Sequence, residues 1–115
     1  MAASLSTLLK RFRGRRIAVA GDFMLDHFLW GQASRLSAEA PVPVVETTSE
    51  TFHPGGAGNV AANLAALGAK VLPFGVLGKD WAGGVLRREL RQRGIPVEGL
   101  FSDSLTTPNG CSSSA

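Results

Sequence analysis

The sequence predicts an α/β protein with a largely parallel sheet. Short apolar runs at residues 16–21 and 70–78 end in glycine, which is typical of buried strands. Between and after them, apolar residues recur at helical spacing over residues 60–67 and 81–93. Strand and helix therefore alternate along the chain, an order that favours helices packed on a parallel sheet.

The chain opens with a predicted leading helix within residues 1–15, which Gly14 can end. This segment is rich in arginine and has no acidic residue, a composition also found in organelle transit peptides. We predict instead a short helix that leads into the first strand. The residues that recur there at helical spacing are Leu5, Leu8, Leu9 and Phe12.

Three further segments predict strands. Residues 22–31 continue the first apolar run, so that one long strand is expected from residue 16 onwards. Residues 40–48 are rich in valine and contain two prolines. Because proline lacks the N–H that a central strand donates, this segment predicts an edge or projecting strand. A last strand is predicted within residues 95–101.

Two helices are predicted after these strands. The first covers residues 60–67, directly after a glycine-rich turn. Asp80 can cap the second, over residues 81–93, in which Glu89 and Arg93 have the spacing of an ion pair. The side chains that share the apolar face of the second helix are Trp81, Val85, Leu86 and Leu90.

Composition and charge narrow the classes of function. No apolar run approaches the roughly 20 residues of a membrane helix, so we expect a soluble, cytoplasmic protein without a membrane partner. The single cysteine, Cys111, excludes an internal disulfide. The net charge is +3, and arginines gather in residues 11–16 and 87–93. We interpret both clusters as solvated helix faces and expect no nucleic-acid partner, because the second cluster has no interleaved aromatic residues to stack on bases.

The glycine-rich turn "HPGGAGNV" raises the question of which ligand it holds. A phosphate-binding P-loop needs Lys and Ser or Thr directly after its last glycine, but Asn59 follows Gly58. The dinucleotide-binding pattern G-x-G-x-x-G/A is satisfied by Gly56, Gly58 and Ala61. We expect residues 47–54 to separate the turn from the preceding strand, and the acidic residue comes late, so this function is disfavoured.

A polyol site is the third interpretation of the turn. Glycines let a ligand approach the backbone, and a helix start presents free N–H donors. The Asn59 amide can both donate and accept, and the carboxylate of Asp26 on another strand would complete a sugar site. A structural turn in which Asn59 caps the helix explains the same residues equally well.

These segments resemble the ribokinase-like, PfkB-type carbohydrate kinases. The run "PGGAGNVAANLAALGAKVLPFGVLG" resembles the first signature of the family, "GKD" with its following glycines resembles a G-x-D-x-x-G element, and "AVAGDFMLD" resembles the opening strand. The resemblance implies the N-terminal part of a ribokinase-like layered fold, with a mostly parallel sheet and projecting lid strands. The residues in register are Gly55, Gly56, Asn59, Ala61, Gly68 and Gly78.

The run "GQASRLSAEAPVPVVE" is similar to the heptose 7-phosphate kinase domain of bifunctional proteins that make ADP-heptose for lipopolysaccharide. This resemblance implies transfer of the γ-phosphoryl group of ATP, with Mg²⁺, to the anomeric hydroxyl of D-glycero-D-manno-heptose 7-phosphate. It also implies a sugar phosphate as the small-molecule partner. The lid strands would pair two subunits of the full-length parent.

The resemblance implies roles for individual residues. Asp26 would accept hydrogen bonds from sugar hydroxyls. Gly55 and Gly56 would give the sugar access to the backbone, and Asn59 would bind another hydroxyl. Asp22 would support the same site or only cap the strand end.

Arg35 is a further candidate for the sugar site. Its positive charge suits the phosphorylated end of the sugar. An ion pair with Glu39 is the structural alternative, and the sequence does not separate the two.

The second signature of the family, a G-A-G-D loop that supplies the general base, has no counterpart in this sequence. No residue is therefore predicted to be catalytic or to bind a metal. We divide the chain into a leading helix (1–15), a family-like part (16–105) and an irregular tail (106–115), and interpret it as a truncated, frame-shifted or deliberate fragment. We expect this piece to be inactive, to bind ATP and Mg²⁺ poorly, and to fold loosely around an open sheet edge and an uncovered apolar face.

Overall fold

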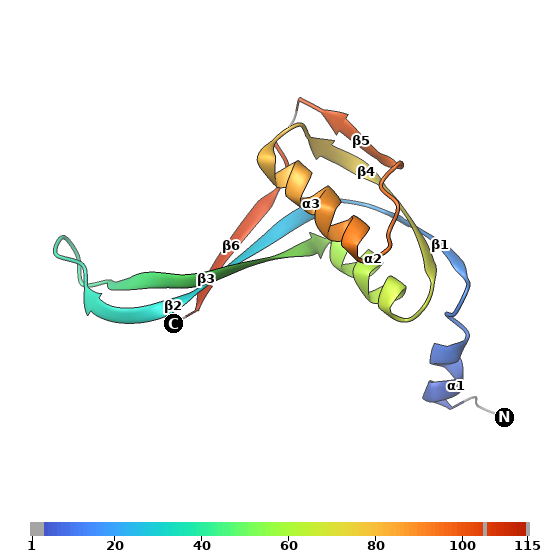
Figure 1. Cartoon of the computed structure of the whole chain (residues 1–115), viewed down its shortest axis with the longest axis horizontal. Helices are drawn as coiled ribbons and strands as arrows, with labels where there is room; N and C mark the ends of the chain where they lie inside the picture. Colours follow the sequence, from blue (N-terminus) through green and yellow to red (C-terminus); the bar gives the residue numbers. More distant parts are fainter. Residues whose placement is uncertain (1–3, 105, 115) are drawn as a thin grey trace.

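The computed structural model describes residues 4–104 and 106–114, and Figure 1 shows their arrangement. Residues 1–3 of the predicted leading segment, together with residues 105 and 115, lie outside the described part. In chain order the elements are α1 (Leu5–Lys10), β1 (Arg16–Ala20), β2 (Phe23–Leu36), β3 (Pro43–Gly56), α2 (Ala57–Ala66), β4 (Lys70–Gly78), α3 (Trp81–Gln92), β5 (Leu100–Asp103) and β6 (Asn109–Ser114).

Three strands form a parallel sheet in the order β1-β4-β5, which confirms the predicted α/β class. The helices α2 and α3 both lie over one face of this sheet (Figure 1). Burial along β4 alternates accordingly, because Val71, Pro73 and Leu77 are buried whereas Leu72 and Phe74 are exposed. Side chains of successive strand residues point to opposite faces, so the helices cover only one of the two.

The core lies between the covered sheet face, α3 and the base of β2. Val85, Leu86 and Leu90 of α3 are buried, as the helical spacing predicts. Trp81 was expected on the same face but is 60% exposed at the start of the helix. Burial of one leucine side chain contributes about 2 kcal/mol to folding. The other large core residues are Val19, Phe23, Leu25, Val71, Leu77, Ile95 and Leu100.

The opposite face of the parallel sheet is apolar and uncovered, as expected from the sequence. Leu72, Phe74 and Val76 of β4 are exposed there, and Phe101 of β5 is 65% exposed. A cavity of about 310 Å³ on this sheet is lined in part by Leu72, Phe74 and Phe101. Both sheet edges, β1 and β5, are also unpaired among the described residues.

The second sheet has the order β3-β2-β6 and contains the lid. We use this name for the antiparallel hairpin of β2 and β3, two strands of 14 residues each. The hairpin projects away from α2 and α3 (Figure 1). β3 lies at the edge of its sheet, which confirms the inference drawn from the prolines.

The single strand predicted over residues 16–31 is in fact two strands. β1 and β2 belong to different sheets, and the chain passes from one to the other at Gly21 and Asp22. The Gly21 N–H donates to the Phe74 carbonyl of β4 at 3.3 Å, and the Asp22 carbonyl accepts from the Ala57 N–H at 2.8 Å. Both halves are apolar, so periodicity alone could not show the change of sheet.

The expected linker before the glycine turn is also absent. Residues 47–54 belong to β3, which passes directly into α2. The helix therefore starts at Ala57 rather than at residue 60. One argument against a dinucleotide site thus fails, while the late position of the acidic residue still disfavours such a site.

The prediction of an irregular tail at residues 106–115 is wrong for residues 109–114, which form β6. β6 pairs in parallel with β2, from Leu25↔Asn109 to Trp30↔Ser114. The prediction relied on apolar periodicity, whereas backbone N–H and C=O groups pair whatever their side chains are. The predicted strand at 95–101 is confirmed only at its end, because β5 begins at Leu100.

Asp80 caps α3 as predicted and also binds Thr107, a contact that the sequence did not indicate. The Asp80 carboxylate accepts from the Gly83 N–H (2.9 Å), the Thr107 N–H (2.8 Å) and the Thr107 hydroxyl (2.7 Å). Thr107 is 1% exposed, and its hydroxyl accepts in turn from the Gly78 N–H at 2.9 Å. The Thr107 hydroxyl, followed by the two N–H donors, lowers the pKa of Asp80 below its ordinary value of 3.8.

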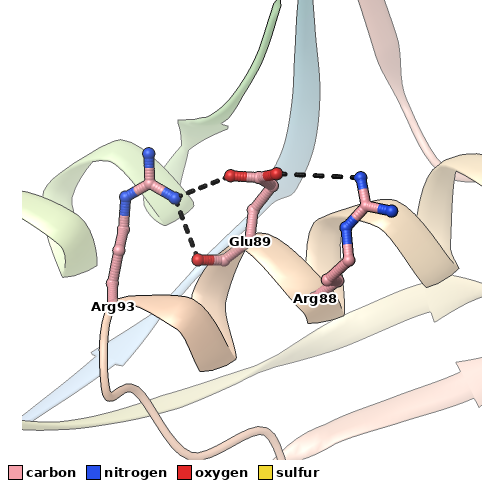
Figure 2. Close-up of polar contacts among 3 residues, drawn as sticks. All are labelled: Arg88, Glu89 and Arg93. Carbon is pink, nitrogen blue, oxygen red and sulfur yellow. Dashed lines mark hydrogen bonds and ion pairs between the residues drawn. The ribbon is translucent and has the colours of Figure 1, made fainter.

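The other end of α3 is held by the predicted ion pair. The Arg93 guanidinium lies 2.9 Å from the Glu89 carboxylate and donates to the Glu89 carbonyl at 2.9 Å (Figure 2). Arg88 approaches the same carboxylate at 3.8 Å. Arg93 therefore satisfies one of the backbone carbonyls that the end of a helix leaves free.

We predict that Thr107→Val destabilises the protein although it preserves the shape of the side chain. The buried Gly78 N–H loses its partner, and Asp80 Oδ1 keeps only the Gly83 N–H; an unsatisfied buried donor costs about 1–3 kcal/mol. The measurement is the midpoint of urea unfolding. Thr106→Val, at the exposed neighbouring position, is the control and should change the midpoint little. Equal midpoints for both variants would contradict the assignment.

We also predict acid-dependent stability from Asp80. A pKa that is lower in the folded than in the unfolded state stabilises the fold above about pH 3.8, and this contribution is lost as the pH falls through the folded value. Urea midpoints of the unmutated chain and of Asp80→Asn should therefore converge as the pH falls below about 3.8 and through the folded pKa of Asp80. Glu98→Gln, which removes an exposed carboxylate, is the control. A constant difference between parent and Asp80→Asn over this range would count against the prediction.

Candidate functional site

The carboxylate of Asp26 lies on β2 between two glycines of the flanking strands. Asp26 pairs with His53 on β3 and with Gly110 on β6. A methyl group added at Gly55 would lie 2.6 Å from each oxygen of this carboxylate, and one at Gly110 would lie 3.5 Å from Oδ1. The carboxylate is therefore directed over the backbone of β3, toward the glycine turn.

This carboxylate has free hydrogen-bonding capacity. Asp26 is half-buried, and its side chain accepts no hydrogen bond from the residues that the structure describes. An ionised carboxylate can accept about four hydrogen bonds. It can thus serve a ligand that carries hydroxyl or other N–H and O–H donors.

The start of α2 lies next to this carboxylate in the chain and in the sheet. Gly56 is the N-cap residue, with φ +58° and ψ −130°, and it provides no side chain to cap the helix. Asn59 is the third residue of α2, is exposed, and makes no capping bond, so the structural alternative with Asn59 as the cap is wrong. The first turn has no side-chain cap, so its backbone N–H donors other than that of Ala57 are available, and it carries a partial positive charge.

Asp22 contributes its backbone to this arrangement. Its carbonyl accepts from the N–H of Ala57, the first residue of α2, and its side chain is exposed. A methyl group at Gly56 would approach that same carbonyl oxygen to 2.5 Å. Asp22 thus attaches the start of the lid to the start of α2, and a role of its carboxylate toward a sugar stays a prediction.

Arg35 does not lie beside the other candidates. It is located near the far end of β2, nine positions beyond Asp26, which corresponds to about 30 Å of extended strand. A single sugar phosphate cannot span that distance within one copy of the chain. The ion pairs of the described residues do not include one between Arg35 and Glu39 either.

His53 is a neighbour of Asp26 that the sequence analysis missed. It lies directly opposite Asp26 in the hairpin, so both side chains emerge on the same face of the sheet. The His53 ring packs edge-on against Phe28 at 5.5 Å. Only the register of β2 with β3 places it there, and that register is not visible in the residue pattern.

The opposite face of the lid contacts α3 through aromatic side chains. The ring of His27 stacks on Phe52 at 4.5 Å, and its Nε2 lies 2.7 Å from the Glu50 carboxylate. Trp81 at the start of α3 approaches Phe52 at 5.4 Å. These contacts join the base of the lid to the helical layer, immediately behind Asp26.

Asp26 does not line the cavities described for this structure. A cavity of about 250 Å³ lies instead between α1 and the end of α2, lined in part by Leu9, Arg13 and Leu67. Another, of about 360 Å³, is lined in part by Phe12, Arg15 and Ile17. Neither offers the combination of a free carboxylate and an uncapped helix start, so we place the candidate site at Asp26.

The fold and the site together define a class of protein. It is an α/β protein in which a projecting two-stranded lid carries a free carboxylate next to a glycine-rich helix start, an arrangement suited to small ligands with several hydroxyl groups. Residues 15–112 match the pfkB family of carbohydrate kinases. The chain belongs to this family, and the match extends into β6, beyond the limit at residue 105 expected from the sequence.

Individual relatives agree with this assignment. The chain is 48% identical, over 99 residues, to the bifunctional protein HldE of Citrifermentans bemidjiense. These residues cover 86% of this chain and 20% of the relative. It thus spans about a fifth of the length of the curated relatives it matches. No helix within the described residues is long and apolar enough to cross a membrane.

Solved structures share the fold. A carbohydrate kinase from Agrobacterium tumefaciens superposes with a TM-score of 0.65 at 25% identity, covering 86% of this chain and 31% of that protein. A fructokinase from Xylella fastidiosa, solved with bound ATP, gives a TM-score of 0.60 at 23% identity, covering 84% and 26%. These likenesses confirm the predicted ribokinase-like, layered α/β architecture.

We predict that Arg35→Ala leaves the affinity of the chain for a sugar phosphate unchanged within about twofold. The side chain is too distant from Asp26 to contact the same ligand in one copy. Isothermal titration calorimetry at low protein concentration provides the measurement. Arg87→Ala, on α3 where Arg87 donates to Ser102 of β5, is the control. A tenfold loss confined to Arg35→Ala would show that the lid tip reaches the site.

Proposed function

We propose that this chain is the sugar-binding part of a carbohydrate kinase that acts on D-glycero-D-manno-heptose 7-phosphate. The main structural support is the free Asp26 carboxylate beside the start of α2, which has no side-chain cap. The chain is also 48% identical to a bifunctional protein HldE. The parent protein would transfer the γ-phosphoryl group of ATP to the anomeric hydroxyl of the sugar. The product would enter the synthesis of ADP-heptose for lipopolysaccharide.

Sugar hydroxyls would bind through complementary polar groups. Asp26 accepts from hydroxyls, and an ionised acceptor makes shorter and stronger hydrogen bonds than a neutral one. The exposed amide of Asn59 can donate to one hydroxyl and accept from another. Met24 and Phe28 lie on β2 at alternate positions to either side of Asp26 and offer apolar surface to the carbon face of a sugar ring.

The cofactors proposed for the parent are ATP and Mg²⁺. The described residues contain no group of three or more His, Cys, Asp or Glu side chains that could hold a metal ion. The residues of this chain would bind and orient the sugar.

An alternative function is a sugar-binding or dimerising module without catalysis, or a kinase for a different sugar of the same family. We further propose a cytoplasmic location, where ATP is available, and pairing of two copies through the lid strands in the parent. Binding with and without turnover of ATP separates these functions.

We predict that Asp26→Asn weakens binding of D-glycero-D-manno-heptose 7-phosphate by about ten- to a hundredfold. The change keeps the size of the side chain but removes the charge, and a hydrogen bond to a charged group is worth about 1.5–3 kcal/mol. Calorimetric titration of the chain measures this loss. Glu98→Gln, outside the lid and away from α2, is the control.

The same titration decides the proposed function. Binding of heptose 7-phosphate in preference to fructose and ribose supports the heptose assignment, and preference for another sugar moves the chain to a different kinase of the family. Phosphorylated product in the presence of ATP would overturn the view that this chain lacks catalysis. Failure to bind any of these sugars would overturn the proposed site.

A further inference from the structure

We infer that Gly55 is a positioning residue for Asp26: it makes room for the carboxylate and thereby directs it toward the start of α2. The expected effect on sugar binding rests on the proposed function, whereas the contact between Gly55 and the Asp26 carboxylate does not depend on it. Gly55 was expected to give a sugar access to the backbone. The structure assigns the space above Gly55 to a side chain of the protein itself.

The space above Gly55 is filled by the Asp26 carboxylate. A methyl group at Gly55 would lie 2.6 Å from Oδ1, 2.6 Å from Oδ2 and 2.7 Å from Cγ of Asp26. Carbon and oxygen atoms do not approach so closely without a bond, so any larger side chain displaces the carboxylate. Gly55 is also buried, which leaves no outward route for such a side chain.

The backbone conformation does not explain the glycine. Gly55 is not among the positive-φ glycines of the described chain, which are Gly14, Gly56, Gly68 and Gly94. Its φ is therefore open to alanine, in contrast with the next residue, Gly56, whose φ of +58° favours glycine. The three atoms that would lie nearest to a methyl group at Gly55 all belong to the Asp26 side chain.

The direction of the carboxylate matters for a ligand. Gly55 directly precedes Gly56, the N-cap of α2, so a carboxylate lying over Gly55 is directed toward the free N–H donors of that helix start. A ligand with neighbouring hydroxyl groups then meets acceptors and donors side by side. Displacement of the carboxylate by a methyl group at Gly55 separates these two sets of partners.

The test is a double-mutant cycle between Gly55→Ala and two variants of Asp26. Asp26→Ala removes the atoms that obstruct the methyl group, whereas Asp26→Asn keeps them and removes only the charge. Stability is measured as the midpoint of urea unfolding by tryptophan fluorescence and, independently, as the rate of proteolytic cleavage within the lid. Gly110→Ala, a strand glycine whose methyl group would lie at an ordinary 3.5 Å from Oδ1, is the matched control for stability.

We expect Gly55→Ala to lower stability and to raise the rate of cleavage in the otherwise unmutated chain and in the Asp26→Asn background. In the Asp26→Ala background, Gly55→Ala should change the urea midpoint and the cleavage rate no more than Gly110→Ala does. An equal loss in all three backgrounds, or no loss in any of them, would overturn the inference. Equal losses would assign the glycine to the backbone or to other neighbours.

Binding is measured separately by calorimetry with D-glycero-D-manno-heptose 7-phosphate. Gly55→Ala should weaken binding at least tenfold, and Gly84→Ala, in open space on α3, should change it less than twofold. Lack of binding by the unmutated chain would refute the proposed function. The stability measurements would still test whether Gly55 makes room for Asp26. Normal binding by a destabilised Gly55→Ala variant would refute the consequence for the site.

Discussion

The site depends on two connections that contain almost no free chain. Only Gly21 and Asp22 separate β1 in one sheet from β2 in the other, and β3 enters α2 without any linker. The hydrogen bond from the Ala57 N–H to the Asp22 carbonyl joins these two connections. The lid must therefore emerge beside the start of α2, and every residue at its base is placed relative to that helix.

A second constraint holds β6 against the lid. Thr107 links the end of β4, through the Gly78 N–H, with the cap of α3 at Asp80. Two residues later the chain enters β6, which pairs with β2 across Asp26. The chain that enters this strand is thus held by the hydrogen bonds of Thr107, and the strand itself by its pairing with β2. Backbone pairing of this kind does not require apolar side chains.

The predictions from sequence succeeded where a local pattern has one structural meaning. The caps and faces of α3, the strand β4 and the edge position of β3 follow from spacing, capping chemistry and proline. The change of sheet at Gly21 could not be predicted, because two consecutive apolar strands look like one. His53 beside Asp26 could not be predicted either, because a shift of one residue in the register of the hairpin would turn it to the other face.

The glycine turn combines three separate requirements within four residues. Gly56 is required by a positive φ, and Gly58 by the close approach of α2 to Pro54, since a methyl group there would lie 2.9 Å from the Pro54 Cβ. These two glycines are required by backbone conformation and packing, and a turn of the same geometry would require them even if it bound no ligand. Gly55 differs, because the group that occupies its space is an ionisable carboxylate without a partner among the described residues. The pairing of Gly55 with Asp26 is therefore the part of the turn that connects the glycine pattern to a function, and the other two glycines are consistent with any function.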